Sequence, residues 1–141
     1  MSEWIELRPD GADALRNRFF DFGDSILQSV QLLVGDRNQR GAQISLMAHD
    51  RESVDDWVEV DFRITSLTSY RCDWPNERGK EVLQNEVCFV WGDGLVFLVV
   101  YPDVFYQAAT LTVPQARQAS FYFAGRRLDW RVGPMKNIGS I

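Results

Sequence analysis

The sequence predicts a mainly β domain with one or two short helices, in which an antiparallel meander forms a strongly curved sheet, a sandwich or a partly open barrel. Three observations predict this class: apolar and polar residues alternate over several stretches, turn-forming segments separate them, and helical patterns are few. The chain has 141 residues, of which 45% are hydrophobic and only 5 are proline. That is enough apolar material for one core, so we expect a single domain over residues 1–141 with an irregular tail over 133–141.

The first half of the chain predicts three consecutive antiparallel strands and one short helix. In the clearest strand Val58, Val60 and Phe62 point to one face, and the charged residues between them point to the other. A short helix is expected over residues 9–16, where acidic residues occupy the first turn. The predicted strands cover residues 25–34, 41–49 and 56–70.

The second half of the chain predicts two hairpins and a second helix. Gly92-Asp93-Gly94 and Ala124-Gly125-Arg126 are the expected turns, because Gly and Asp tolerate the positive φ that tight turns require. Residues 95–100 are apolar on both faces, which favours a central strand that is covered on both sides. Residues 114–119 begin with proline and continue with good helix formers. The predicted hairpins pair residues 86–91 with 95–101 and residues 121–123 with 128–132.

Phenylalanine supplies much of the expected core. These residues alternate with polar ones as buried residues do. The phenylalanines expected to be buried are Phe19, Phe20, Phe22, Phe62, Phe89, Phe97, Phe121 and Phe123.

Charge and cysteine content narrow the function classes. Fifteen basic and twenty acidic residues give a net charge of −5 and an isoelectric point near 4.8, so the chain is a poor candidate for binding nucleic acid or anionic membranes. The longest uncharged apolar run, 95–102, is shorter than the ~20 residues of a membrane-spanning helix. The N-terminus has no run typical of a signal peptide. We therefore expect a cytoplasmic protein in which Cys72 and Cys88 are free thiols.

Candidate catalytic and metal-binding residues are few. The single histidine, His49, is followed by Asp50 and Glu52, but these side chains alternate in direction at the end of a strand. We therefore expect no metal and no cofactor. Cys72 could meet His49 in space, which leaves a small Cys/His enzyme as a third hypothesis for function.

An acidic segment suggests the leading hypothesis, a surface that binds a basic protein. Residues 50–61 hold six acidic residues and one arginine, and Glu59 and Asp61 share one strand face with Trp57. Charge would steer the encounter and the tryptophan would anchor the partner, although an ordinary solvated strand face would look the same. The candidate partner-binding residues are Asp50, Glu52, Asp55, Asp56, Trp57, Glu59 and Asp61.

A second hypothesis is a small-molecule-binding β-barrel or helix-grip protein. Tyr70 and Trp74 stand on either side of a short polar segment, where they could line a pocket. A basic residue at the last predicted turn could hold an anionic ligand. The candidate ligand-binding residues are Tyr70, Trp74, Trp91 and Arg126.

The order of three segments resembles that of small bacterial immunity-type proteins of polymorphic and contact-dependent toxin systems. The segments are Phe19-Phe20-Asp21-Phe22-Gly23-Asp24-Ser25, Trp57-Val58-Glu59-Val60-Asp61-Phe62 and the closing stretch from Phe121 to Trp130. The resemblance spans residues 19–132. It implies a non-enzymatic protein that binds and inhibits a toxin domain, with no catalytic residues of its own.

Overall fold

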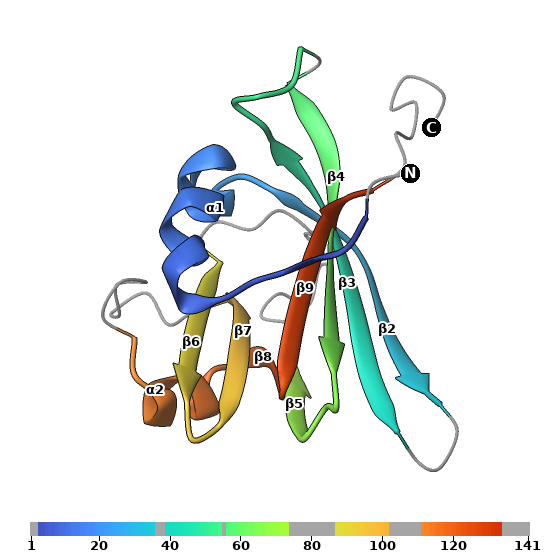
Figure 1. The fold of residues 1–141 in the computed structure, drawn as a ribbon, viewed down its shortest axis with the longest axis vertical. Helices are drawn as coiled ribbons and strands as arrows, with labels where there is room; N and C mark the ends of the chain where they lie inside the picture. The colour runs from blue at the N-terminus through green and yellow to red at the C-terminus, as the bar shows by residue number, and fades with distance from the viewer. Residues whose placement is uncertain (1–2, 36–38, 55, 74–86, 102–110, 134–141) are drawn as a thin grey trace.

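The predicted fold class is confirmed: two antiparallel sheets and a few short helices make up the protein (Figure 1). The computed structural model describes residues 3–35, 39–54, 56–73, 87–101 and 111–133. Residues 134–141 of the predicted tail lie outside these ranges. Within the described strands, neither sheet closes into a barrel.

One sheet has five strands and the other has four. The five-stranded sheet has the order β1-β9-β4-β3-β2 and the four-stranded sheet the order β5-β8-β7-β6. The first contains the predicted meander, β2-β3-β4, and the second contains β6-β7-β8, of which the sequence predicted the hairpin between β6 and β7. The first sheet comprises β1 (Ile5–Glu6), β2 (Ile26–Val34), β3 (Arg40–His49), β4 (Trp57–Thr65) and β9 (Arg127–Val132). The second comprises β5 (Ser69–Cys72), β6 (Cys88–Gly92), β7 (Leu95–Tyr101) and β8 (Phe121–Gly125).

The predicted strand over 56–70 and the predicted hairpin over 121–132 are both wrong in the same way. The first divides into β4 and β5, and the second into β8 and β9, and each pair of strands passes from one sheet to the other. The two crossings lie side by side, since Thr68 N–H donates to the Ala124 carbonyl at 2.8 Å and Arg126 N–H donates to the Thr65 carbonyl at 3.0 Å. One antiparallel ladder therefore bends around the corner where the sheets meet.

Close packing at Gly125 explains why the ladder can bend there. A β carbon at this position would lie 2.5 Å from Ile64 Cγ2 and 2.7 Å from the Thr65 carbonyl oxygen. Ser66, directly after the end of β4, turns the chain with a φ of 56°. The backbones of the two sheets approach closely at this corner because residue 125 has no side chain.

The main core lies between the inner faces of the two sheets. Phe62 of β4 packs edge-on against Phe22, and its ring centroid lies 5.6 Å from that of Phe89 on β6. As predicted, β7 is covered on both faces: Leu98 lies in this core and Phe97 in a second cluster. The second cluster is closed by α2 (Val113–Gln118), which begins with a capping box between Thr112 and Gln115.

The predicted N-terminal helix begins as a short 3-10 turn, η1 (Pro9–Gly11), and continues as α1 (Ala12–Arg18). A second 3-10 turn, η2 (Phe20–Phe22), leads into β2. Leu15 of α1 is buried in the main core. None of the helices in the described ranges is long and apolar enough to cross a membrane.

Candidate functional site

The acidic residues of β4 do not form the solvated face that the sequence predicted. The side chains of Glu59 and Asp61 do point away from the core, but the residues are only 5% and 1% exposed. Asp61 accepts a hydrogen bond from Ser45 Oγ at 2.7 Å and one from Arg131 Nε at 3.0 Å. Both carboxylates also lie against Gly133, where a β carbon would collide with them.

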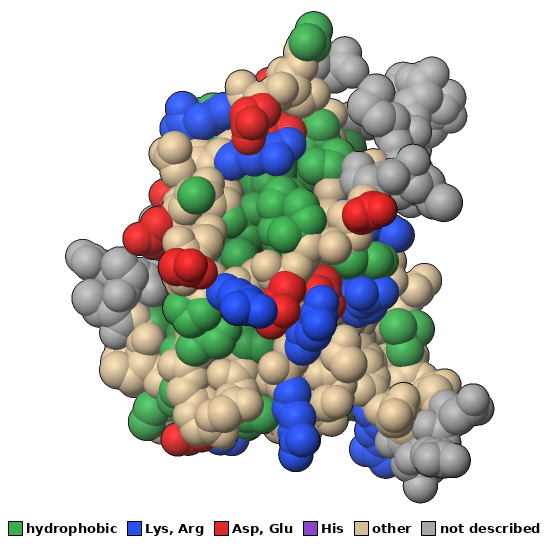
Figure 2. Space-filling model, in the orientation of Figure 1, with side chains coloured by type: hydrophobic (Ala, Val, Ile, Leu, Met, Phe, Trp, Pro, Cys, Tyr) green, Lys and Arg blue, Asp and Glu red, His purple; other side chains and the backbone are tan. Residues whose placement is uncertain are grey.

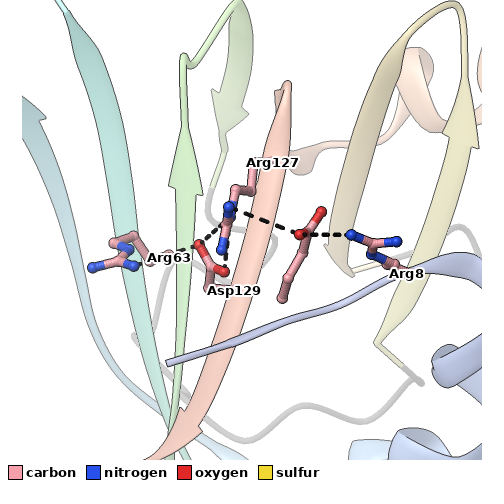
Figure 3. Close-up of polar contacts among 5 residues, drawn as sticks. Arg8, Arg63, Arg127 and Asp129 are labelled. Atoms are coloured by element: carbon pink, nitrogen blue, oxygen red, sulfur yellow. Dashed lines mark hydrogen bonds and ion pairs between the residues drawn. The ribbon is translucent and has the colours of Figure 1, made fainter. Parts of the chain in front are cut away.

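A network of ion pairs covers the same sheet face further along (Figure 3). Asp129 is only 1% exposed. Its carboxylate oxygens accept hydrogen bonds from Arg127 Nε at 3.0 and 3.2 Å and from Arg63 Nη2 at 3.5 Å. Arg127 also pairs with Glu6 at 3.8 Å, and Glu6 pairs with Arg8 at 3.4 Å. The acidic charge on this face is thus neutralised within the protein.

Trp4 completes the cover over the outer face. The guanidinium groups of Arg63 and Arg131 lie 4.4 and 4.1 Å from its ring centroid. Arg131 pairs with Asp61, and Gly133 lies against both carboxylates. Glu59 and Asp61 are therefore buried members of this face, and the prediction that they form an exposed docking surface is wrong.

Asp50 is also buried, at 3% exposure, and it fixes the loop between β3 and β4 to α1. Its two carboxylate oxygens accept from Arg18 Nε at 3.0 Å and Arg18 Nη2 at 3.1 Å, and Oδ1 accepts from Glu52 N–H at 2.9 Å. Burial opposes ionisation, but the hydrogen bonds from Arg18 and Glu52 and the charge of Arg18 together hold the pKa of Asp50 below its ordinary value. Asp50 is therefore a structural anchor of this loop.

Next to Asp50, four side chains form an unbroken series of contacts, which we call the aromatic cluster. Trp57 and His49 lie with ring centroids 3.9 Å apart, and His49 meets Phe20 edge-on at 6.3 Å. The Arg51 guanidinium lies 3.8 Å from the centroid of Phe20. His49 Nδ1 also lies 3.2 Å from both carboxylate oxygens of Asp56. The aromatic cluster consists of Phe20, His49, Arg51 and Trp57.

Unusual backbone geometry places Phe20 in this cluster. Phe20, Asp21, Phe22 and Asp24 all have φ between 55° and 61°, in the left-handed region that non-glycine residues rarely adopt. Phe19 and Phe22 are fully buried on either side of the turn, whereas Phe20 is 43% exposed. The prediction that Phe20 belongs to the core is therefore wrong. The core contacts of its neighbours hold it at the surface in a strained conformation, which is characteristic of functional sites.

An apolar groove of about 370 Å³ opens beside the aromatic cluster. Its apolar lining includes Ile5, Leu15 and Trp130, and Arg18 and Glu52 connect it to the loop between β3 and β4. Figure 2 shows this apolar surface between α1 and β9, with charged side chains above and below it. An apolar centre with a charged rim is the usual composition of a protein-binding surface.

The structure places the predicted partner-binding residues in two groups. Trp57 is half-buried within the aromatic cluster, and Glu52 and Asp56 are exposed beside it. Asp50, Glu59 and Asp61 are buried, and Asp55 lies outside the described residues.

The predicted ligand-binding residues are not brought together. Tyr70 on β5 and Trp91 on β6 lie on opposite edge strands of the four-stranded sheet, and Arg126 lies at the corner between the sheets. None of these three lines the groove. Trp74 lies outside the described residues.

The possible Cys/His pair is divided between the two sheets. Cys72 lies on β5 and His49 at the end of β3, in contact with the aromatic cluster. Burial and the neighbouring charge of Asp73 raise the pKa of the Cys72 thiol, which disfavours the reactive thiolate. Cys72 and Cys88 are free thiols, as predicted. In the described part of the chain, no three histidine, cysteine or acidic side chains are grouped to hold a metal ion.

Sequence reasoning missed Phe20, Arg51 and the groove. One signal for Phe20 was present, because three aromatic residues within Phe19–Phe22 cannot all enter one core from a short turn. The groove depends on contacts between α1 and the distant β9, which no local pattern reports. Comparisons with protein-family models, curated proteins and solved structures give no match to this chain.

Proposed function

We propose that the protein is a non-enzymatic cytoplasmic binding protein, an immunity-like inhibitor that masks a basic surface of a toxin or effector protein. The aromatic cluster carries this proposal, and the neighbouring groove extends the docking surface. The kind of partner is the one that the sequence suggests, a basic protein. The surface of this chain that binds it, however, is the end of the sheet and not the outer face of β4.

The composition and rigidity of the aromatic cluster support a binding role. Binding energy at protein interfaces is concentrated in a few aromatic and arginine side chains. Arg51 is fixed in position because its Nε donates to the Asn17 carbonyl at 2.7 Å and its N–H donates to the Arg18 carbonyl at 3.0 Å. Side chains that are already ordered lose little conformational entropy when a partner binds.

The charge around the cluster supports a basic partner. The side chains of Glu52 and Asp56 are 66% and 61% exposed at the same loop. Acidic groups at the rim of an interface accelerate association with a basic protein. We expect a smaller electrostatic effect than the sequence alone suggests, because three of the acids in residues 50–61 are buried.

The groove favours a second candidate function, the binding of a small amphipathic molecule. Its volume of about 370 Å³ lies in the range of roughly 300–1,000 Å³ that is typical of ligand sites. The ligand would lie on Leu15 and Trp130, and Arg8 at the rim would meet a polar group. This arrangement replaces the four residues that were proposed from the sequence.

Growth protection tests the leading proposal. The product of the neighbouring reading frame is expressed in bacteria alone and together with this chain, and growth is measured. We expect that product to arrest growth and this chain to restore it. Replacement of Phe20 and Trp57 by alanine should abolish protection, whereas Tyr70→Ala should not, since Tyr70 is an exposed aromatic residue on the other sheet. A toxic neighbour that this chain does not neutralise would contradict the proposal.

A further inference from the structure

The outer edge of β2 is a long strand edge whose register with β3 is irregular near its start, between Leu27 and Ser29, and regular from Ser29 to Val34. β2 is the last strand of the five-stranded sheet and pairs only with β3 among the described strands. Its nine residues, Ile-Leu-Gln-Ser-Val-Gln-Leu-Leu-Val, include no charge and no proline. Proteins normally protect such edges with lysine, proline or very short strands. The opposite edge strand, β1, illustrates this with only two residues.

Exposed apolar residues are concentrated on the same strand. Leu32, Leu33 and Val34 are 48%, 41% and 79% exposed, and they are consecutive. Leu32 lies opposite Ala42 on the core side of the sheet, whereas Leu33 lies opposite Gly41 on the outer side. Both faces of the strand therefore carry apolar surface up to its free edge.

We propose that β2 pairs with β2 of a second copy of the chain, antiparallel and about a two-fold axis at Gln31. In this register Gln31 lies opposite Gln31 of the second copy, Val30 opposite its Leu32, and Leu32 opposite its Val30. The register keeps the faces of the sheet continuous, because Val30 and Leu32 both point to the core side, opposite Ile44 and Ala42. Two five-stranded sheets then become one sheet across the axis.

A second copy suits this edge because the strand is complementary to itself in both shape and charge. The chain carries a net charge of −5, so two copies repel each other over most surfaces, but residues 26–34 bring no like charges together. The apolar pairs between Val30 and Leu32 occur twice, once on each side of the axis. One strand pair is smaller than the roughly 800 Å² per partner of a standard interface, so we expect a dimer that dissociates on dilution.

Sedimentation velocity over a range of concentrations tests this pairing. We expect a monomer–dimer equilibrium for the natural chain. Gln31→Glu places two carboxylates opposite each other at the axis, so it should weaken the dimer by at least about tenfold. Gln31→Lys should do the same, and an equimolar mixture of the two variants should form a mixed dimer. Gln31 is exposed, so both variants should retain the fold, which circular dichroism verifies.

The matched control is Gln118→Glu, which makes the same charge change at an exposed position at the end of α2. It should leave the equilibrium unchanged. A natural chain that stays monomeric at every concentration would overturn the proposal. So would a dimer that withstands both Gln31 variants, a mixture that fails to recover the dimer, or growth beyond a dimer. The outcome is independent of the proposed function, since the aromatic cluster is not involved.

Discussion

The ion pair between Arg18 and Asp50 should contribute strongly to stability because it attaches the loop beneath the aromatic cluster to α1. The perturbation is a double-mutant cycle of Arg18→Met, Asp50→Ala and the double variant. Methionine retains most of the apolar contacts of the arginine stem, so the cycle isolates the interaction between the two charged groups.

The magnitude follows from burial and geometry. Two parallel hydrogen bonds of 3.0 and 3.1 Å join side chains that are 27% and 2% exposed. A hydrogen bond to a charged group contributes roughly 1.5–3 kcal/mol, and solvent around Arg18 reduces this, so we expect a coupling energy of about 2 kcal/mol. Asp50→Ala alone should cost about 3 kcal/mol, because the Glu52 N–H loses its acceptor and Arg18 keeps only the exposed carboxylate of Glu52, 2.9 Å from its Nε.

Urea denaturation of the four proteins measures the coupling energy. The matched control is the exposed pair between Glu6 and Arg8, at 3.4 Å with side chains 35% and 72% exposed. Its coupling energy should be below about 0.5 kcal/mol. Equal coupling energies for the two pairs would refute the argument that Asp50 anchors the loop.

Three further results are expected. Gly125→Ala should lower the free energy of unfolding by about 3 kcal/mol, because the new β carbon overlaps the neighbouring strand. Gly94→Ala should lower it by only about 1 kcal/mol, because the φ of 73° is strained for alanine but the space around it is open. Equal effects of the two substitutions would contradict the close approach at the corner. The pKa of Asp50 is lowered from an ordinary value of 3.8, so the ionised carboxylate contributes fully to stability above pH 3.8, and this contribution is lost as the pH falls through the lowered pKa. Acid titration of the natural chain should show this loss of stability, and the Asp50→Ala variant should show a smaller loss. Thiol counting in denaturant without reductant should give two thiols, and one or no free thiols would indicate a disulfide. In the native protein Cys72 should react more slowly than a peptide thiol, because its pKa is raised. The buried Cys88 should react only when the protein unfolds.

Local alternation predicted the strands well because it depends on neighbouring residues. β4 follows the predicted alternation from Val58 to Ile64, and β7 is covered on both faces as its uninterrupted apolar run suggested. The turn at Gly92-Asp93-Gly94 also joins β6 to β7 as expected, with Asp93 and Gly94 at positive φ. At Gly125 the sequence predicts a tight hairpin turn, but the chain instead crosses from one sheet to the other, because the contact that demands glycine comes from the distant strand β4.

The candidate site was predicted only in part because alternation identifies a face but not what covers it. Glu59 and Asp61 point away from the core as predicted, yet the guanidinium group that pairs with Asp61 belongs to Arg131, 70 residues later. Trp57 lies near the start of the predicted strand, at the start of β4, but its contact with His49 and the exposed position of Phe20 involve β3 and the turn after α1, which no local pattern reports. Such long-range pairs leave no periodic signal in the sequence.

The role of the aromatic cluster is tested most directly by the rates at which the toxin found in the growth assay binds to and leaves this protein. If the aromatic cluster anchors the partner, Trp57→Ala should raise the dissociation rate by an amount equivalent to about 2 kcal/mol or more and leave the association rate nearly unchanged. Joint replacement of Glu52 and Asp56 by their amides should instead slow association, most clearly at low salt. A dissociation rate that Trp57→Ala does not change would contradict the central claim that this end of the sheet binds the partner.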